Sequence, residues 1–252
     1  MTLLAVERIK LFTTRSPWWC ALLTLLITVG FAALIAGTTD AGTGTVASTQ
    51  FGYSFGLAVI MVLAALAVTT EYRFGTIRTT FQAVPNRTSV LLAKAGVVSL
   101  LALVIGEVAA FGSLAVSMAI QPEADLALNS TADWINVVGI GPIYALTAVI
   151  GMSVGLLIRH SAGAISLLLI YTLAVESLVA LIPNVGDDIQ KWMPFHVAEK
   201  FLTGDGATRG GEMSGPPLSS SPLSPGWALA YFAGFALLML IIGISTARKR
   251  DA

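Results

Sequence analysis

The sequence predicts an all-α integral membrane protein with six transmembrane helices. Of its 252 residues, 56% are hydrophobic and only 11% are charged, and the mean hydropathy is +0.83. A typical soluble domain carries about 25% charged residues. So few charges cannot cover a water-soluble fold, whereas a bilayer requires apolar helices of about 20 residues each. Composition therefore excludes a soluble globular domain.

Six apolar segments are long enough to cross a bilayer as helices. In chain order they run over about Pro17 to Gly37, Phe51 to Thr70, Val90 to Ile120, Ile135 to Ile158, Ala162 to Ile182 and Trp227 to Ala247. We treat residues 1–252 as a single transmembrane domain built from these spans.

The basic residues predict the orientation, because cytoplasmic loops retain an excess of Lys and Arg. With both termini in the cytoplasm, eleven of the 14 basic residues fall in the inner segments. Only Lys191, Lys200 and Arg209 lie outside. We therefore expect a multi-pass protein of the cell membrane with cytoplasmic N- and C-termini.

The long connection over 183–226 is predicted to lie outside the cell and to have two parts. Residues 187–202 mix large apolar side chains with charged ones, which indicates short amphipathic helices at the outer interface, broken at Pro194. Residues 204–225 are rich in Gly, Ser and Pro, which is typical of a flexible loop.

A compact charged segment, EYRFGTIRTTFQAVPNR, separates the second and third spans at residues 71–87. Helical spacing over about Arg73 to Val84 predicts a short amphipathic helix on the inner membrane surface, ended by Pro85. Its apolar stripe consists of Phe74, Ile77, Phe81 and Val84. Two interpretations remain open: a loop whose arginines meet anionic lipid head groups, or a helix that docks into a partner's groove.

The run Glu71-Tyr-Arg-Phe-Gly-Thr-Ile-Arg-Thr-Thr, then Val84-Pro-Asn-Arg87 and Leu91-Leu-Ala-Lys94, resembles the region after the second span in small permeases of type 2 ABC exporters. These are six-span proteins of actinobacterial drug, antibiotic and lantibiotic efflux systems. In that family the segment is the coupling helix, which sits in a cleft of a separate ATPase subunit. The resemblance assigns this ATPase-coupling role to Glu71, Arg73, Phe74, Gly75, Ile77, Arg78, Phe81, Pro85 and Arg87.

The resemblance implies a permease subunit of an ATP-driven exporter that works by alternating access. Its expected partners are two copies of an ABC ATPase, a second permease subunit, identical or related, and the lipid bilayer, but no nucleic acid. No lysine follows a glycine, so the chain has no G-x-x-x-x-G-K-[ST] phosphate loop. ATP and Mg are therefore expected on the partner, with no cofactor in this chain. An apolar lumen would suit an amphiphilic small molecule, drug, lipid or peptide.

Glu107 and Glu176 lie near the middle of the third and fifth spans. A charged side chain there costs about 2.5 to 3.5 kcal/mol, so such residues face the protein interior. Both are candidates for the translocation path, or each is held by neighbouring hydroxyl groups. They also support an alternative function, a proton-coupled secondary carrier without an ATPase. A non-transporting membrane scaffold or immunity protein is a further alternative.

Gly151-Met-Ser153-Val-Gly155 satisfies the G-x-S-x-G pattern of serine hydrolases. That motif requires a strand, a sharp turn and a helix, whereas here it lies inside an apolar helical segment. We expect Gly151 and Gly155 to form a small-residue packing surface instead. Two distant histidines and the single Cys20 do not predict a metal site.

Overall fold

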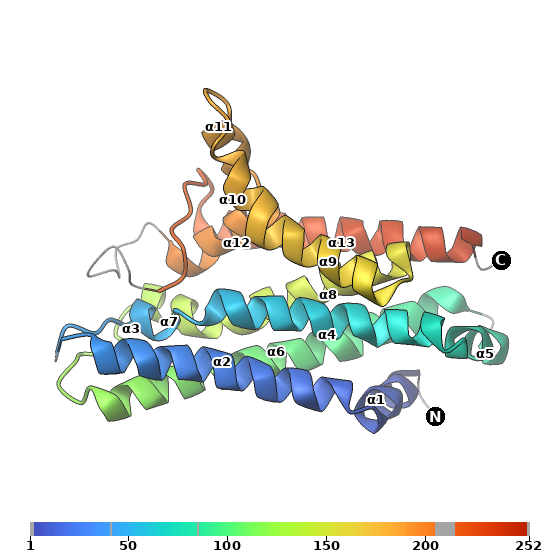
Figure 1. Ribbon diagram of the computed structural model, residues 1–252, viewed down its shortest axis with the longest axis horizontal. Helices are drawn as coiled ribbons and strands as arrows, with labels where there is room; N and C mark the ends of the chain where they lie inside the picture. Colours follow the sequence, from blue (N-terminus) through green and yellow to red (C-terminus); the bar gives the residue numbers. More distant parts are fainter. Residues whose placement is uncertain (1–2, 41, 85, 205–214, 251–252) are drawn as a thin grey trace.

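The computed structural model describes residues 3–40, 42–84, 86–204 and 215–250, and every regular element in these ranges is helical (Figure 1). Six stretches are long and apolar enough to cross a membrane. They are Ser16–Thr38, Val46–Arg73, Arg87–Ile120, Thr131–Ile158, Ser161–Val179 and Pro225–Arg250. The prediction of an all-α fold with six spans is confirmed.

The first half of the chain contributes α1 (Leu3–Thr13), α2 (Ser16–Thr38), α3 (Val46–Thr49), α4 (Tyr53–Arg73), α5 (Thr76–Ala83) and α6 (Arg87–Ile120). The second half contributes α7 (Thr131–Val138), α8 (Ile140–Ile158), α9 (Ser161–Ile170), the π-helix η1 (Tyr171–Val175), α10 (Glu176–Val179), α11 (Gly186–Gln190), α12 (Pro194–Thr203) and α13 (Pro225–Arg250). Figure 1 shows both chain ends and α5 at the same end of the bundle. We call this end, with α1, α5 and the last turn of α13, the basic end.

The helix α8 forms the centre of the bundle and packs against α4, α6 and α13. In its span, Thr131–Ile158, 72% of the most apolar window is buried. Tyr144 is fully buried and donates a hydrogen bond of 2.8 Å to the carbonyl oxygen of Tyr53 on α4. An otherwise apolar contact between two spans is thus fixed by one buried polar group.

Glycines allow α8 to approach its neighbours closely. A Cβ atom on Gly151 or Gly155 would lie 3.1 to 3.2 Å from atoms of α4. The predicted packing role of these two glycines is therefore confirmed. Ser153, between them, lies in the middle of a continuous helix and donates its hydroxyl proton to the carbonyl oxygen of Val149 at 2.7 Å. It has none of the strand-turn-helix geometry of a hydrolase nucleophile.

The fifth span leaves the bundle. Only 17% of its window is buried, and Figure 1 shows α9, η1 and α10 diverging from the other spans toward α11. The chain then returns through α12, which packs against α13 and α7. Pro194 is the first residue of α12, a position where its missing N–H costs nothing. The loop predicted over 204–225 falls partly on 205–214, which includes Arg209 and lies outside the described residues.

Candidate functional site

The segment between the second and third spans forms a helix end and a separate short helix. The helix α4 continues to Arg73, and α5 begins at Thr76. Gly75 stands between them with φ of 72°, in the left-handed conformation that ends many helices. The prediction of one helix from Arg73 to Val84 is therefore wrong at its start, because Gly75 stops α4 and redirects the chain.

The break divides the predicted apolar stripe. Ile77 is 4% exposed and Phe81 packs against the core from a partly buried position, so these two side chains anchor α5 to the bundle. Phe74 lies before the break and is 71% exposed. Val84 follows α5 in an extended conformation. Phe74 thus does not share a face with Ile77 and Phe81.

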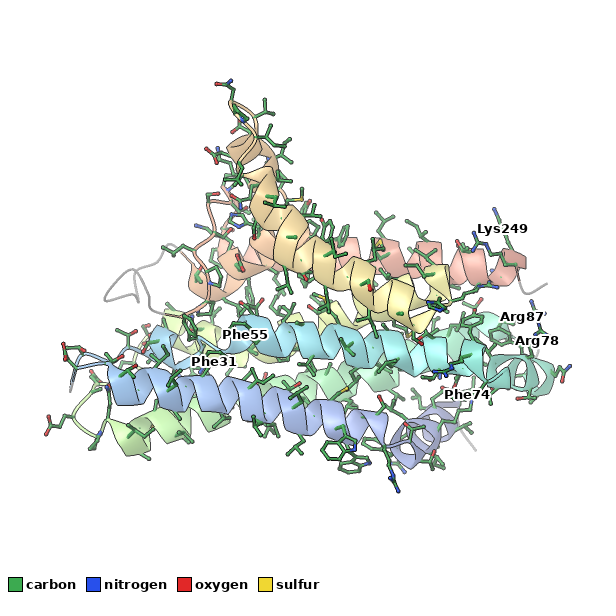
Figure 2. All side chains as sticks on the ribbon, viewed as in Figure 1. Phe31, Phe55, Phe74, Arg78, Arg87 and Lys249 are labelled. Carbon is green, nitrogen blue, oxygen red and sulfur yellow. The ribbon has the colours of Figure 1, made fainter. Side chains whose placement is uncertain are left out.

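The arginines of this segment lie at its surface or over aromatic rings. Arg73 and Arg78 are exposed. The guanidinium carbon of Arg87 lies 5.5 Å from the centre of the Phe81 ring, a cation–π contact that joins the start of α6 to α5. Figure 2 shows Arg78 and Arg87 at the tip of the basic end. Pro85 lies outside the described residues.

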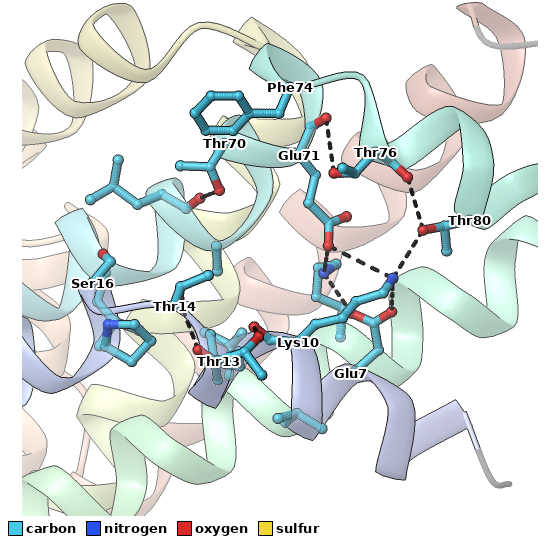
Figure 3. A pocket seen from close by; sticks show the side chains of 18 of the residues that line it. Glu7, Lys10, Thr13, Thr14, Ser16, Thr70, Glu71, Phe74, Thr76 and Thr80 are labelled. Atoms are coloured by element: carbon cyan, nitrogen blue, oxygen red, sulfur yellow. Dashed lines mark hydrogen bonds and ion pairs between the residues drawn. The ribbon is translucent and has the colours of Figure 1, made fainter.

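Glu71 points away from this surface, into a group of charges that we call the ion cluster: Glu7, Lys10, Glu71 and Lys94 (Figure 3). Lys94 Nζ lies 2.5 Å from Glu7 Oε2 and 2.8 Å from Glu71 Oε1. Lys10 Nζ lies 2.8 Å from Glu7 Oε1 and 3.8 Å from Glu71 Oε1. Lys10 also donates a hydrogen bond of 2.9 Å to the hydroxyl oxygen of Thr80 on α5.

The ion cluster joins four helices at the basic end. Glu7 and Lys10 come from α1, Glu71 from α4, Lys94 from α6, and the hydroxyl partner from α5. Its two acidic and two basic side chains have no net charge. The side chains of Glu7 and Lys94 are only 3% and 6% exposed. Because an unpaired buried charge is costly, each member depends on the others.

The sequence analysis did not identify Glu7 or Lys10 as site residues. One signal could have found them: Glu7 is the only acidic residue before Asp40, in a segment that otherwise carries Arg8, Lys10 and Arg15. A single carboxylate among basic residues indicates a local ion pair. Glu7 does pair locally with Lys10, but its second partner, Lys94 on α6, comes from far along the chain, which no spacing within the first helix could show.

A cavity of about 700 Å³ lies beside the ion cluster (Figure 3). Its wall includes the residues between α1 and α2, the last part of α4, the first turns of α5 and the start of α6. Charged and hydroxyl side chains line it together with apolar ones from α4 and α6, including Leu63 and Val98. We call this space the basic-end cavity.

Glu176 has a structural partner far along the chain. Its carboxylate accepts hydrogen bonds from the backbone N–H groups of Phe195 at 3.1 Å and His196 at 2.9 Å. These are N–H groups of the first turn of α12, which lack partners within their own helix. Glu176 is 6% exposed and thus caps α12 from the fifth span. The hydroxyl group of Tyr171, a neighbour in the same span, also forms a hydrogen bond with the Glu176 carboxylate.

Glu107 has a different environment. It is partly buried on α6 and lies directly over Gly141 of α8, where a Cβ atom would come within 2.2 Å of Glu107 Oε1. Among the described residues, none forms a hydrogen bond or ion pair with its carboxylate. The structure does not bring Glu107 and Glu176 together in one contact, so each is a separate candidate for the translocation path.

The sequence matches the ABC-2 family transporter protein family over residues 3–175. This match covers more than half of the chain and includes α1, α5 and the whole ion cluster. The chain therefore belongs to the ABC-2 transporter family. It is a multi-pass protein of the cell membrane, and its family supplies the membrane component of transporters that have an ABC ATPase partner. No curated protein matches the sequence closely enough to suggest a substrate.

Proposed function

We propose that this chain is the permease subunit of an ATP-driven exporter, with α5 as the element that receives force from a separate ATPase. The observation that carries the proposal is the position of α5. It lies at the same end as both termini and is anchored by Ile77 and Phe81. Arg78 on α5, and Arg73 and Phe74 at the adjoining end of α4, are exposed. A buried anchor with a charged and aromatic outer surface suits a helix that docks into a partner's cleft.

The ion cluster gives this docking element a rigid connection to the bundle. Movement of α5 reaches α1 through the hydrogen bond between Lys10 and Thr80, and α1 is tied to α4 and α6 through Glu7 and Lys94. In this proposal Glu71 holds the cluster together from inside, while the arginines contact the ATPase. The two roles differ, although the residues are neighbours in the sequence.

Transport requires more than this chain. In this six-span bundle, packed side chains surround the central helix α8, so one bundle offers little room for a translocation path. We therefore propose two permease subunits, with two ATPases, around a shared translocation path. The first and fifth spans, 22% and 17% buried, offer apolar surface both to a second permease and to lipid. The proposed substrate is an amphiphilic small molecule, drug, lipid or peptide, moved out of the cell.

The test is to express the chain with its cognate ABC ATPase and measure complex formation and substrate-stimulated ATP hydrolysis. Arg78→Glu should weaken both, because it reverses an exposed charge on α5. Lys249→Glu is the matched control: it reverses an exposed charge at the same end, but on α13. Equal values for wild type, Arg78→Glu and Lys249→Glu would reject the docking role of α5.

The same preparation tests the carrier alternative. A purified chain that moves substrate along a pH gradient without any ATPase would replace the exporter with a proton-coupled carrier. In that case Glu107→Gln should abolish the pH dependence, since this carboxylate has no protein partner among the described residues. If transport requires the ATPase and ATP, the exporter proposal stands.

A further inference from the structure

We propose that the basic-end cavity binds one molecule of phosphatidylglycerol, an anionic glycerophospholipid, from the membrane leaflet at this end. The cavity of about 700 Å³ has the size of a small-molecule site, which spans about 300 to 1,000 Å³. The proposal concerns binding to the permease alone. It therefore does not depend on the ATPase partner or on the transported substrate.

The wall of the cavity changes from polar to apolar along the axis of the bundle. Glu71 and Lys94 mark the charged end. On α4, Leu63 lies about 12 Å deeper than Glu71 at the helical rise of 1.5 Å per residue. On α6, Val97 and Val98 follow Lys94 in the same direction. An amphiphile with its head group at the charged end and its acyl chain along these apolar side chains has the orientation of a lipid in that leaflet.

The charge of the lining favours an anionic head group. The two acids and two lysines of the ion cluster compensate one another. Arg15, between α1 and α2, also lines the cavity, and its exposed guanidinium forms no hydrogen bond or ion pair with any described residue. One positive charge therefore remains for the ligand. A phosphodiester has one negative charge and oxygens that accept from a guanidinium.

The hydroxyl groups of the lining favour a head group with donors of its own. Four threonine side chains of the cavity donate their protons to backbone carbonyl oxygens three or four residues earlier, at 2.6 to 2.9 Å. They are Thr13, Thr14, Thr70 and Thr79. Their oxygens remain as acceptors. The glycerol hydroxyls of phosphatidylglycerol can donate to them, whereas a phosphatidylcholine head group has no donor.

The depth of the cavity also fits a lipid head group. Trp18 and Trp19 follow Arg15 by one helical turn and are 61% and 67% exposed. Exposed indole rings next to a membrane span lie at the level of the head groups. Arg15 is therefore placed where a phosphate of the adjoining leaflet is found.

The test is native mass spectrometry of the purified full-length chain in detergent, titrated with phosphatidylglycerol or phosphatidylcholine of identical acyl chains. We expect one tightly held phosphatidylglycerol per chain, bound about fivefold more strongly than phosphatidylcholine, because one basic residue near a lipid surface is worth about 1 kcal/mol. Arg15→Gln should remove this preference. Arg8→Gln, an exposed arginine of α1 outside the cavity lining, should retain it.

A second variant tests the apolar half. Ala67→Phe places a ring in the cavity and should prevent stoichiometric lipid binding while Arg15 remains intact. The thermal midpoint in detergent checks that the variant folds, and Val97→Phe replaces it if it does not. Equal binding of both lipids to the wild type, or equal phosphatidylglycerol binding to wild type, Arg15→Gln and the filled-cavity variant, overturns the proposal.

Discussion

Lys94 is the residue on which the basic end depends most directly. Its ammonium group lies between two carboxylates from different helices, and only 6% of its side chain is exposed. Its sequence context, an apolar run, gives no sign of these partners. The buried lysine is tolerated because the carboxylates of Glu7 and Glu71 compensate its positive charge.

Replacing Lys94 with methionine should strongly destabilise the protein. Lys94→Met removes the positive charge shared by Glu7 and Glu71, and loss of one partner from a buried ion pair costs about 3 to 5 kcal/mol. The measurement is the thermal unfolding midpoint in detergent. Lys10→Met should have a smaller effect, because the Lys10 side chain is 32% exposed.

A double variant separates the pairing from the packing of this side chain. Lys94→Met with Glu71→Met leaves Glu7 paired with Lys10 and removes the uncompensated charge of Glu71. It should therefore be more stable than the sum of the two single effects predicts. Strict additivity would show that the ion pair contributes nothing.

Gly75 controls the break between α4 and α5. In the left-handed conformation a side chain with a Cβ costs about 1 to 2 kcal/mol, so Gly75→Ala should lower stability although no atom lies near the added methyl group. Gly234→Ala is the control, because Gly234 lies within α13, also in open space, where alanine favours the helix. Thermal unfolding of both variants checks this. A loss of stability in Gly234→Ala equal to that in Gly75→Ala would contradict the role of the backbone angle.

At the level of elements, the fifth span and α12 depend on each other. The π-helix η1 adds a residue to the turn directly before Glu176 and so changes the direction of this side chain. The carboxylate then meets the first turn of α12, whose N–H groups carry partial positive charge. A span that leaves the bundle is thereby connected to a helix that returns to it.

The capping of α12 predicts a local effect of Glu176→Gln. A glutamine has one carbonyl oxygen for the two N–H groups of Phe195 and His196 and loses the negative charge, which costs about 1 kcal/mol. Hydrogen exchange should therefore become about fivefold faster at the start of α12. Asp188→Asn on α11, an exposed carboxylate, should leave exchange there unchanged. Unchanged exchange in Glu176→Gln would exclude the capping role.

At one end of the whole molecule lie both termini and α5, whereas α3 and α7 lie toward the opposite end and α11 lies at the tip of the diverging fifth span (Figure 1). The excess of Lys and Arg predicts that the basic end lies in the cytoplasm. In a Cys20→Ala background, Arg78→Cys should react with a membrane-impermeant maleimide only after the cells are opened. Lys191→Cys should react on intact cells. The reverse pattern would invert the orientation and place α5 out of reach of a cytoplasmic ATPase.

The sequence predicted the six spans because each is a run of apolar residues long enough to cross a bilayer, a property that does not depend on what the run contacts. It also predicted that Gly151 and Gly155 pack against a neighbouring helix, since small residues four apart share one helix face. It predicted the amphipathic segment after the second span, but not the break at Gly75. Helical periodicity alone gave no weight to a left-handed backbone angle.

The sequence by itself determined that this protein lies in the membrane, how many times it crosses, and where a charged connection between spans would occur, because hydrophobicity and charge act locally along the chain. Tertiary structure decided which charges meet. Glu7 pairs with Lys94, and Glu71 points into the ion cluster while Arg78 is exposed. Glu176 accepts hydrogen bonds from the first turn of α12. These partners are distant in sequence, and buried charge is stable only where packing brings its partner within reach.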